Sequence, residues 1–163
     1  SRTRTETELD TTARVVAKSP CKVLVVPRGQ TLWNKTIFLA TDGSRYSDRA
    51  AVTATILAKK ADIPLRVVSV VESLSNTSRH AIAKDALDRV LAHAKEAGVQ
   101  VSGNVIEGHP VVDALAEAAA ACQADLVVGG SHGRTGMERV FLGSVMERLI
   151  GRVSCPVLAI KGG

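Results

Sequence analysis

The sequence predicts an α/β domain in which helices cover both faces of a doubly wound, mostly parallel sheet of five strands. Short runs of Val, Leu and Ile alternate with longer segments of helical spacing along most of the 163 residues. Apolar residues make up 45% and aromatic residues only 2%, so the core must be aliphatic, as in buried parallel strands. The length suits one domain of this type and is too short for two.

The predicted elements are read from apolar periodicity and from the residues that start and stop helices. Before the main domain these are one or two helical turns at 10–18, a strand at 22–26 and a linker at 28–35. The first half of the domain then has a strand at 36–40, a turn at 41–44, a helix to residue 61 capped by Ser47 or Asp48, a strand at 65–71 and a helix at 79–97 stopped by Gly98. The second half has a strand at 99–106, a helix from Pro110 to Cys122, a strand at 125–129, a helix at 144–151 and a strand at 156–160.

Two unusual loops are expected at the same edge of this sheet. Strands that alternate with helices run parallel, with right-handed crossovers, and ligands of such sheets bind beyond the carboxyl ends of the strands. The turn at 41–44 and the glycine-rich stretch at 130–143 each follow a strand directly. A ligand site is therefore predicted where these two segments meet.

The glycine-rich stretch carries the strongest functional signal. Gly130 and Gly133 allow backbone N–H groups to approach an anion without a Cβ in the way. Gly143 and Ser144 open a helix whose free N–H groups and positive dipole end attract phosphate. No GKS or GKT follows, and the spacing is not GxGxxG, so the stretch is neither a P-loop nor a dinucleotide fingerprint. Two sets of amide donors could close on one polyphosphate.

These residues give the chain its resemblance to the universal stress protein family, over about residues 35–161. The pieces that match are Ala40-Thr41-Asp42-Gly43-Ser44, Asp125-Leu126-Val127-Val128-Gly129-Gly130, Ser131-His132-Gly133-Arg134, Gly143-Ser144 and Cys155-Pro156-Val157-Leu158. The family's ATP-binding branch is marked by G-x-x-G, nine residues, then G-[ST], and this pattern is complete here. The resemblance implies an adenine nucleotide alpha hydrolase-like fold and a cytoplasmic stress-response regulator that binds ATP, or AMP or ADP, with Mg²⁺.

The resemblance also assigns a nucleotide-binding set. It implies that Asp42 lies near the ribose and the metal, and that Ala40 with Val70 or Val71 lines the adenine pocket. The remaining contacts would go to ribose and phosphate from Gly130, His132 and Gly133, and to the phosphates from Gly143, Ser144 and Val145. Many ATP-binding relatives have a hydroxyl residue where this chain has Met146, so one phosphate contact is in doubt, and with it affinity and metal use.

Several single residues have a structural interpretation beside a functional one. Asp42 could equally form an Asx turn at the strand–helix junction. His132 has no nucleophile with an orienting acid, and His80, His93 and His109 lack metal-ligand spacing, so no catalytic residue and no protein metal site is predicted. With no Walker-type lysine and no evident base, at most slow ATPase or autophosphorylation activity is expected.

Functions of other classes are less well supported. A nucleotide-free interaction module that assembles through its last strand remains the alternative. An adenylyl-transferring enzyme would need an HxGH signature near the first strand, and a phosphorelay receiver would need a second acid beside Asp42. The net charge of +5 is without a dense basic run, and no apolar stretch reaches membrane-spanning length, so neither nucleic acid nor membrane is an expected partner.

The predicted tail, residues 1–34, contains a short internal repeat, or echo, of the end of the predicted domain at 35–163. Arg14 to Val26 resembles Arg148 to Ile160, with Arg, Cys, Val and Leu in the same register. We interpret the tail as the end of a preceding copy of the domain, although short apolar strands can also match by chance. Strand 22–26 is expected to pair antiparallel with strand 156–160, within the chain as in a tandem or between chains as in a homodimer. Cys21, Cys122 and Cys155 are expected to be reduced thiols.

Overall fold

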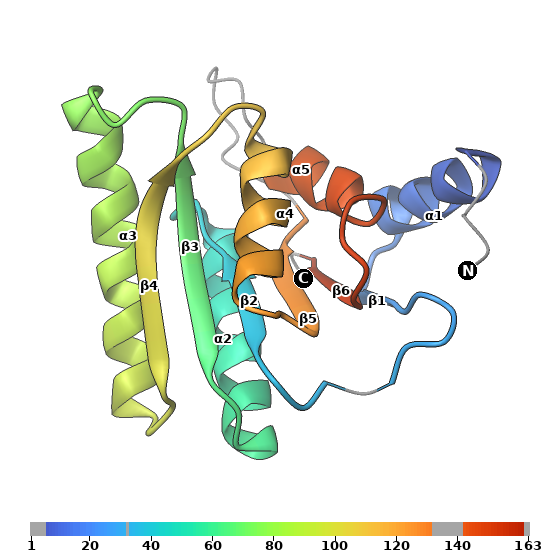
Figure 1. Cartoon of the computed structure of the whole chain (residues 1–163), viewed down its shortest axis with the longest axis horizontal. Coiled ribbons are helices and arrows are strands. Elements are labelled where there is room, and N and C mark those ends of the chain that lie inside the picture. The colour runs from blue at the N-terminus through green and yellow to red at the C-terminus, as the bar shows by residue number, and fades with distance from the viewer. Residues whose placement is uncertain (1–5, 32, 132–141, 162–163) are drawn as a thin grey trace.

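The computed structural model describes residues 6–31, 33–131 and 142–161. In this part of the chain six strands form one sheet, in the order β1-β6-β5-β2-β3-β4, and helices cover both of its faces (Figure 1). The strands from β2 to β6 pair in parallel, and only β1 is antiparallel to its neighbour β6. The predicted fold class is confirmed, and β1 is the additional strand at the edge of the five-stranded parallel sheet.

The bounds of the elements agree with the sequence patterns to within a few residues. The strands are β1 (Val23–Val25), β2 (Ile37–Ala40), β3 (Leu65–Val71), β4 (Val101–Glu107), β5 (Leu126–Gly130) and β6 (Val157–Ile160). The helices are α1 (Glu6–Lys18), α2 (Arg45–Ala61), α3 (Thr77–Glu96), α4 (Val111–Ala121) and α5 (Leu142–Leu149). None of these helices is both long and apolar enough to cross a bilayer.

The alternation of side chains along β2 explains why helices are needed on both sides. Ile37 and Leu39 enter one apolar cluster with α2 and α3, whereas Phe38 and Ala40 enter a second cluster with α1, α4 and α5. All four residues are fully buried. A central strand that is apolar at every position is typical of a parallel sheet covered on both faces.

The start of α2 corrects one prediction. The cap is Ser44, not Ser47 or Asp48: the Ser44 hydroxyl accepts a hydrogen bond of 3.2 Å from the Ser47 amide. Ser47 lies inside the first turn, where its hydroxyl donates to the Ser44 carbonyl at 2.9 Å. The helix therefore begins about one turn earlier than expected. The sequence could not select the cap, because Ser44, Ser47 and Asp48 all have side chains that can cap a helix.

Three other helices also begin before the predicted residue. α3 begins at Thr77 rather than at residue 79. α1 begins at Glu6 rather than at residue 10, and α5 begins at Leu142 rather than at residue 144, so that Gly143 lies in its first turn. The end of α3 matches the prediction, since Gly98 follows the helix with a φ of +81°, a left-handed conformation that suits glycine.

The segment before β2 is held against the domain at both ends. The expected pairing of the N-terminal strand is confirmed, with Leu24 opposite Leu158. Further along, Trp33 packs against the cluster formed by α2 and α3. The Asp125 carboxylate then accepts backbone hydrogen bonds of 2.6, 2.8 and 3.0 Å from Asn34, Lys35 and Thr36.

Candidate functional site

The strand order places a topological switch point between β2 and β5. From β2 the chain crosses through α2 to β3 on one side, and from β5 it crosses through α5 to β6 on the other. The two strands are parallel neighbours, with Leu39 opposite Val128. The turn at 41–44 and the segment that follows β5 therefore leave the sheet at the same edge, as predicted, and open sheets of this class bind ligands there.

The turn after β2 is closely tied together. The Ser44 amide donates to Asp42 Oδ1 at 2.9 Å, which is the Asx turn that the sequence allowed. Gly43 has a φ of +74°, and a Cβ there would lie 3.0 Å from the Ala86 Cβ of α3. The Thr41 hydroxyl donates to Ser47 Oγ at 3.3 Å. Among the described residues no buried side-chain nitrogen or oxygen lacks a partner, so this turn offers a ligand mainly backbone groups and the rest of the Asp42 carboxylate.

Gly130 has a packing reason to be glycine. A Cβ at this position would lie 2.8 Å from the Tyr46 carbonyl carbon and 2.9 Å from the Ser47 amide nitrogen. Only glycine lets the end of β5 approach the first turn of α2 this closely. The close contact draws the two loops of the switch point together.

The first turns of α5 stand over the end of β5. Met146 is fully buried, and its thioether fills the space above Gly129, where any added Cβ would collide with it. Val145 is also buried, with 5% of its surface exposed. Met146, where the resemblance led us to expect a hydroxyl residue, thus packs into the core, and this packing holds the N-terminus of α5 beside the carboxyl end of β5.

The predicted adenine-pocket residues divide between the two faces of the sheet. Ala40 belongs to the cluster beneath α4 and α5, and the half-buried Val70 packs against the same cluster. Val145, which was predicted to contact the phosphates, also belongs to this cluster. Val71 is 6% exposed and belongs to neither cluster. Val70 is therefore the valine that the structure brings to the side of Ala40 and Val145.

Part of the predicted site cannot be compared with the structure. His132 and Gly133 lie outside the described residues. Gly143 and Ser144 are described only as backbone in the first turn of α5.

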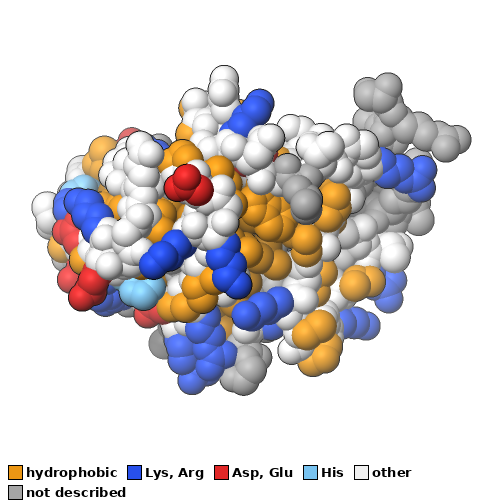
Figure 2. Space-filling view, turned by 90° about the horizontal axis from the view of Figure 1, so that it is seen from below, with side chains coloured by type: hydrophobic (Ala, Val, Ile, Leu, Met, Phe, Trp, Pro, Cys, Tyr) orange, Lys and Arg blue, Asp and Glu red, His pale blue; other side chains and the backbone are white. Residues whose placement is uncertain are grey.

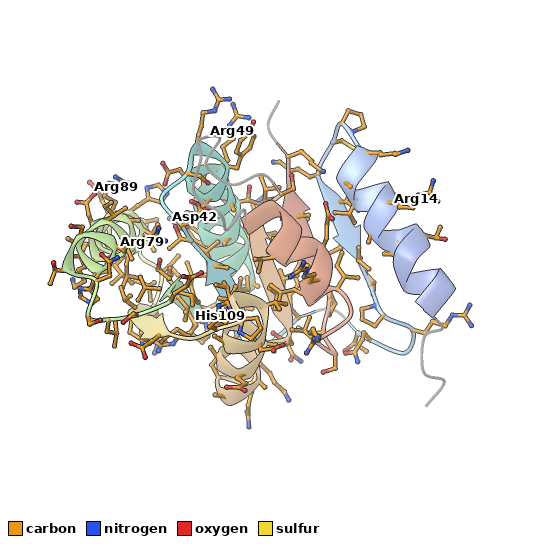
Figure 3. The ribbon with its side chains drawn as sticks, turned by 90° about the horizontal axis from the view of Figure 1, so that it is seen from above. Arg14, Asp42, Arg49, Arg79, Arg89 and His109 are labelled. Carbon is orange, nitrogen blue, oxygen red and sulfur yellow. The ribbon has the colours of Figure 1, made fainter. Side chains whose placement is uncertain are left out.

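Charged side chains surround the carboxyl edge, and the sequence patterns did not single out their pairing. Figure 3 looks onto this edge, with Asp42 between Arg49, Arg79 and Arg89 on one side and His109 on another. Arg89 lies 3.7 Å from Asp48, and His109 Nδ1 lies 3.9 Å from Glu72 Oε1. These partners come from different elements, so no local spacing in the sequence could reveal them.

A shallow cavity of about 340 Å³ lies next to the Asp42 turn, between that turn and α3. Sequence patterns did not predict this cavity, because its lining residues on α3 have the spacing of an ordinary buried helix face. Within the described ranges no group of three or more His, Cys, Asp or Glu residues is arranged to hold a metal ion. The lining residues are Gly43, Ala81, Ile82, Asp85, Ala86 and Arg89.

Comparison with known proteins identifies the family. Residues 34–161 match the model of the universal stress protein family. A universal stress protein of Methanocaldococcus jannaschii is 35% identical over 150 residues, covering 84% of this chain and 87% of the relative.

Solved structures agree with this relationship. A universal stress protein crystallised in complex with cAMP is 28% identical, with a TM-score of 0.62 over 77% of this chain and 96% of the other. A longer universal stress protein of Archaeoglobus fulgidus, 24% identical, shares the fold over 93% of this chain and 53% of its own, with a TM-score of 0.69. The chain belongs to the universal stress protein family.

Proposed function

We propose that this chain binds an adenine nucleotide at the switch point and acts as a stress-response regulator with at most slow hydrolysis. One observation carries the proposal: the turn after β2, the end of β5 and the first turn of α5 meet at one edge of the sheet. Of the motif that marks the family's ATP-binding branch, Gly130 ends β5, and Gly143 and Ser144 lie in the first turn of α5. Gly133 lies outside the described residues.

The phosphates would be held by backbone groups. The first four amides of α5 have no partner within the helix, and its positive dipole end favours an anion. Gly133 and His132 would supply further contacts from the preceding loop. Mg²⁺, when bound with ATP, would offset the charge of the phosphate oxygens, and Asp42, in the turn after β2, is the carboxylate that would lie near the metal.

The base would be held by apolar surface. Ala40 and Val70 share one cluster at the end of β2 and β3, and Val71 is the alternative wall. Val145, which the resemblance assigns to the phosphates, packs in the same cluster. The related structure that holds cAMP supports a ligand with an adenine base, since it is 28% identical over most of the domain. AMP, ADP and ATP would all present this base and differ in the number of phosphates that the loop and α5 must neutralise.

The groups at this edge suit nucleotide binding with slow turnover better than fast catalysis. Asp42 Oδ1 already accepts the Ser44 amide, and the turn depends on that bond. A general base must be free to take a proton from water, and no described side chain at the edge is oriented for this by a second group. We therefore assign no catalytic residue.

Isothermal titration with ATP, ADP and AMP tests the proposal. The chain should bind at least one of them, and replacing Gly133 and Gly143 together by Val should abolish binding, because both side chains would block backbone donors. Gly29→Val is the control, because Gly29 lies in the linker, away from the switch point, with no atom near its Cβ position. Unchanged affinity in the double variant would remove the glycine motif from the site.

A second experiment separates the two roles of Asp42. Asp42→Asn keeps an oxygen that can accept the Ser44 amide, whereas Asp42→Ala does not. If the carboxylate contributes to the nucleotide site, Asn should preserve stability but weaken the Mg²⁺ dependence of binding. Equal, Mg²⁺-independent affinity in the original chain and the Asn variant would restrict Asp42 to the turn.

The second candidate function is a protein-interaction module that works without a ligand. The pairing of β1 with β6 favours it, because it occurs at the last strand, where assembly as a homodimer or tandem was expected. A chain that gains no thermal stability with any of the three nucleotides would favour this function over the first.

A further inference from the structure

The pairing of β1 with β6 has an internal two-fold symmetry. The sequence echo aligns Val23, Leu24 and Val25 with Val157, Leu158 and Ala159. In the ladder Leu24 lies opposite Leu158, Val23 opposite Ala159, and Val25 opposite Val157. Each residue thus pairs as its counterpart does, with Leu24 and Leu158 at the centre. This is the arrangement that two copies of β6 would adopt if they paired with each other across a two-fold axis.

The helix before β1 follows the same symmetry. α1 packs against α5, its counterpart in the echo, and both lie on the same face of the sheet (Figure 1). Val16 of α1 is fully buried in the cluster that also contains its counterpart Ile150. The buried residue Lys161, 6% exposed, donates a hydrogen bond of 3.3 Å from its ammonium to the Ala17 carbonyl. Strand pairing, apolar packing and this hydrogen bond together fix the segment on the domain.

The outer side of the segment differs from its C-terminal counterpart. Val15 is 56% exposed and Val26 is 49% exposed, whereas their counterparts Leu149 and Ile160 are fully buried beneath the domain's own helices and strands. Cys21 is exposed where Cys155 is buried. The segment therefore packs its inward face as a terminal helix and strand do, while among the described residues nothing covers its other face.

From these observations we infer that the N-terminal segment, α1 with β1, imitates the terminal helix and strand of a second copy and occupies the chain's own pairing edge. The partner that fits the surface formed by β6 and α5 is the same surface of another copy of this chain. Two copies can pair through it only after the N-terminal segment has been displaced. The chain therefore does not pair with a second copy through β6 while its N-terminal segment is in place.

Tethering explains why the segment prevails over a second copy. It is joined to β2 by a short linker, and a short flexible connection gives an effective concentration on the order of millimolar. A second copy at micromolar concentration must overcome that advantage of roughly a thousandfold. Displacing the segment removes the competition and leaves the backbone of β6 unpaired, which favours pairing with another strand.

Disulfide trapping in the full chain tests the inference without disturbing the fold. With the exposed Cys21 replaced by Ser, Leu24→Cys and Leu158→Cys should form an intrachain disulfide, since directly opposed residues have Cβ atoms close enough to be bridged. Leu158→Cys without Leu24→Cys should give little cross-linked dimer on a non-reducing gel. Efficient dimer formation by that single-site variant would overturn the inference, because it would place two copies of β6 together while the segment is present.

Displacement of the segment supplies the complementary test. Val16→Asp with Leu24→Pro should release it, because a carboxylate would be buried in an apolar cluster and proline cannot pair as leucine does. Sedimentation should then give twice the 17.1 kDa of one chain, and Leu158→Cys in this background should cross-link between chains. Circular dichroism checks that the domain itself stays folded.

The matched control is Val15→Asp with Arg28→Pro. Val15 is the exposed neighbour of Val16, and Arg28 precedes Gly29 in a turn closed by the Gln30 amide and the Pro27 carbonyl, a position where proline is favoured. This control should sediment as a single chain. A folded Val16→Asp and Leu24→Pro variant that remains single would refute the inference, as would dimer formation by the control.

Discussion

Gly129 and Gly130 are neighbours at the end of β5, but a methyl group added at each would meet different atoms. At Gly130 it would meet the backbone of Tyr46 and Ser47, which cannot move without shifting α2. At Gly129 it would meet the flexible end of the Met146 side chain. Sequence reasoning assigned Gly130 to ligand binding and did not foresee this packing role, because the contact joins residues far apart in the chain.

Gly130→Ala should therefore destabilise the protein more than Gly129→Ala. Overpacking against rigid neighbours typically costs about 1–3 kcal/mol, and the flexible thioether should relieve much of that at Gly129. Urea unfolding of both variants measures the difference. If Gly129→Ala proves the more harmful, Met146 is held more rigidly than its side-chain freedom suggests.

The Cys155 thiol should titrate far above the usual range. Burial raises the pKa of Cys155 from 9.0 to about 11, and the nearby Asp125 and Cys122 raise it as well. Iodoacetamide should therefore modify the exposed Cys21 well before Cys155 as pH rises through 9. Mass spectrometry of the modified peptides measures the order, and equal rates at pH 9 would contradict it.

The same shift predicts how stability depends on pH. Between pH 9 and about 11 the folded chain keeps the Cys155 proton while the unfolded chain loses it. The folded state binds more protons in that window, so stability falls as pH rises through it and is unaffected by this group below it. Cys155→Ala should remove this part of the alkaline decline, measured by urea unfolding at several pH values.

At the scale of elements, Asp125 joins two segments that are distant in sequence. Its carboxylate receives three backbone amides from residues 34–36, just before β2. Hydrogen bonds to an ionised group contribute about 1.5–3 kcal/mol each when well shielded, and less where water competes. The pattern of apolar runs gave no sign of this contact, since an acid before a strand has many ordinary uses.

Asp125→Ala should destabilise the protein by about 2 kcal/mol, because three amides lose a charged acceptor and two of them can turn to water. Asp125→Asn keeps one acceptor oxygen and should cost roughly half as much. Chemical denaturation gives both values. A loss below a few tenths of a kcal/mol in the alanine variant would mean that solvent replaces the carboxylate fully.

The sequence predicted elements better than their ends, for identifiable reasons. β3 matches its predicted range because Pro64 precedes it and four of its seven residues are valine. α2 was placed too late because Ser44, Ser47 and Asp48 all have capping side chains, and only the folded backbone selects Ser44. At the candidate site, the meeting of β2 with β5 followed from topology, whereas the His109–Glu72 pair depended on tertiary geometry.

For the whole molecule, nucleotide binding should appear as thermal stabilisation. A ligand at about 100 times its Kd adds about 2.7 kcal/mol to a folded state that alone binds it. For a domain of this size that corresponds to a rise in Tm of roughly 5–10 °C. Differential scanning fluorimetry with ATP measures it, and the Gly133→Val and Gly143→Val double variant should show no rise.

The distribution of charge over the molecule argues against one large anionic partner. The net charge is +5, yet Figure 2 shows Lys and Arg spread around an apolar centre at the amino ends of the parallel strands, with Asp and Glu among them. At the opposite edge Arg89 is shared between Asp85 and Asp48. A compact ligand held by backbone amides suits such a surface better than a long polyanion.

The short antiparallel strand at the edge of the sheet has a consequence for solubility. Without β1, β6 would be the edge strand, and its unpaired backbone groups could pair with strands of other chains. Instead the outermost strand has only three residues and is followed closely by Pro27, so little backbone remains for another chain to extend. During folding, before β1 has paired, the edge of β6 is exposed, and this is the stage at which pairing with other chains most favours aggregation.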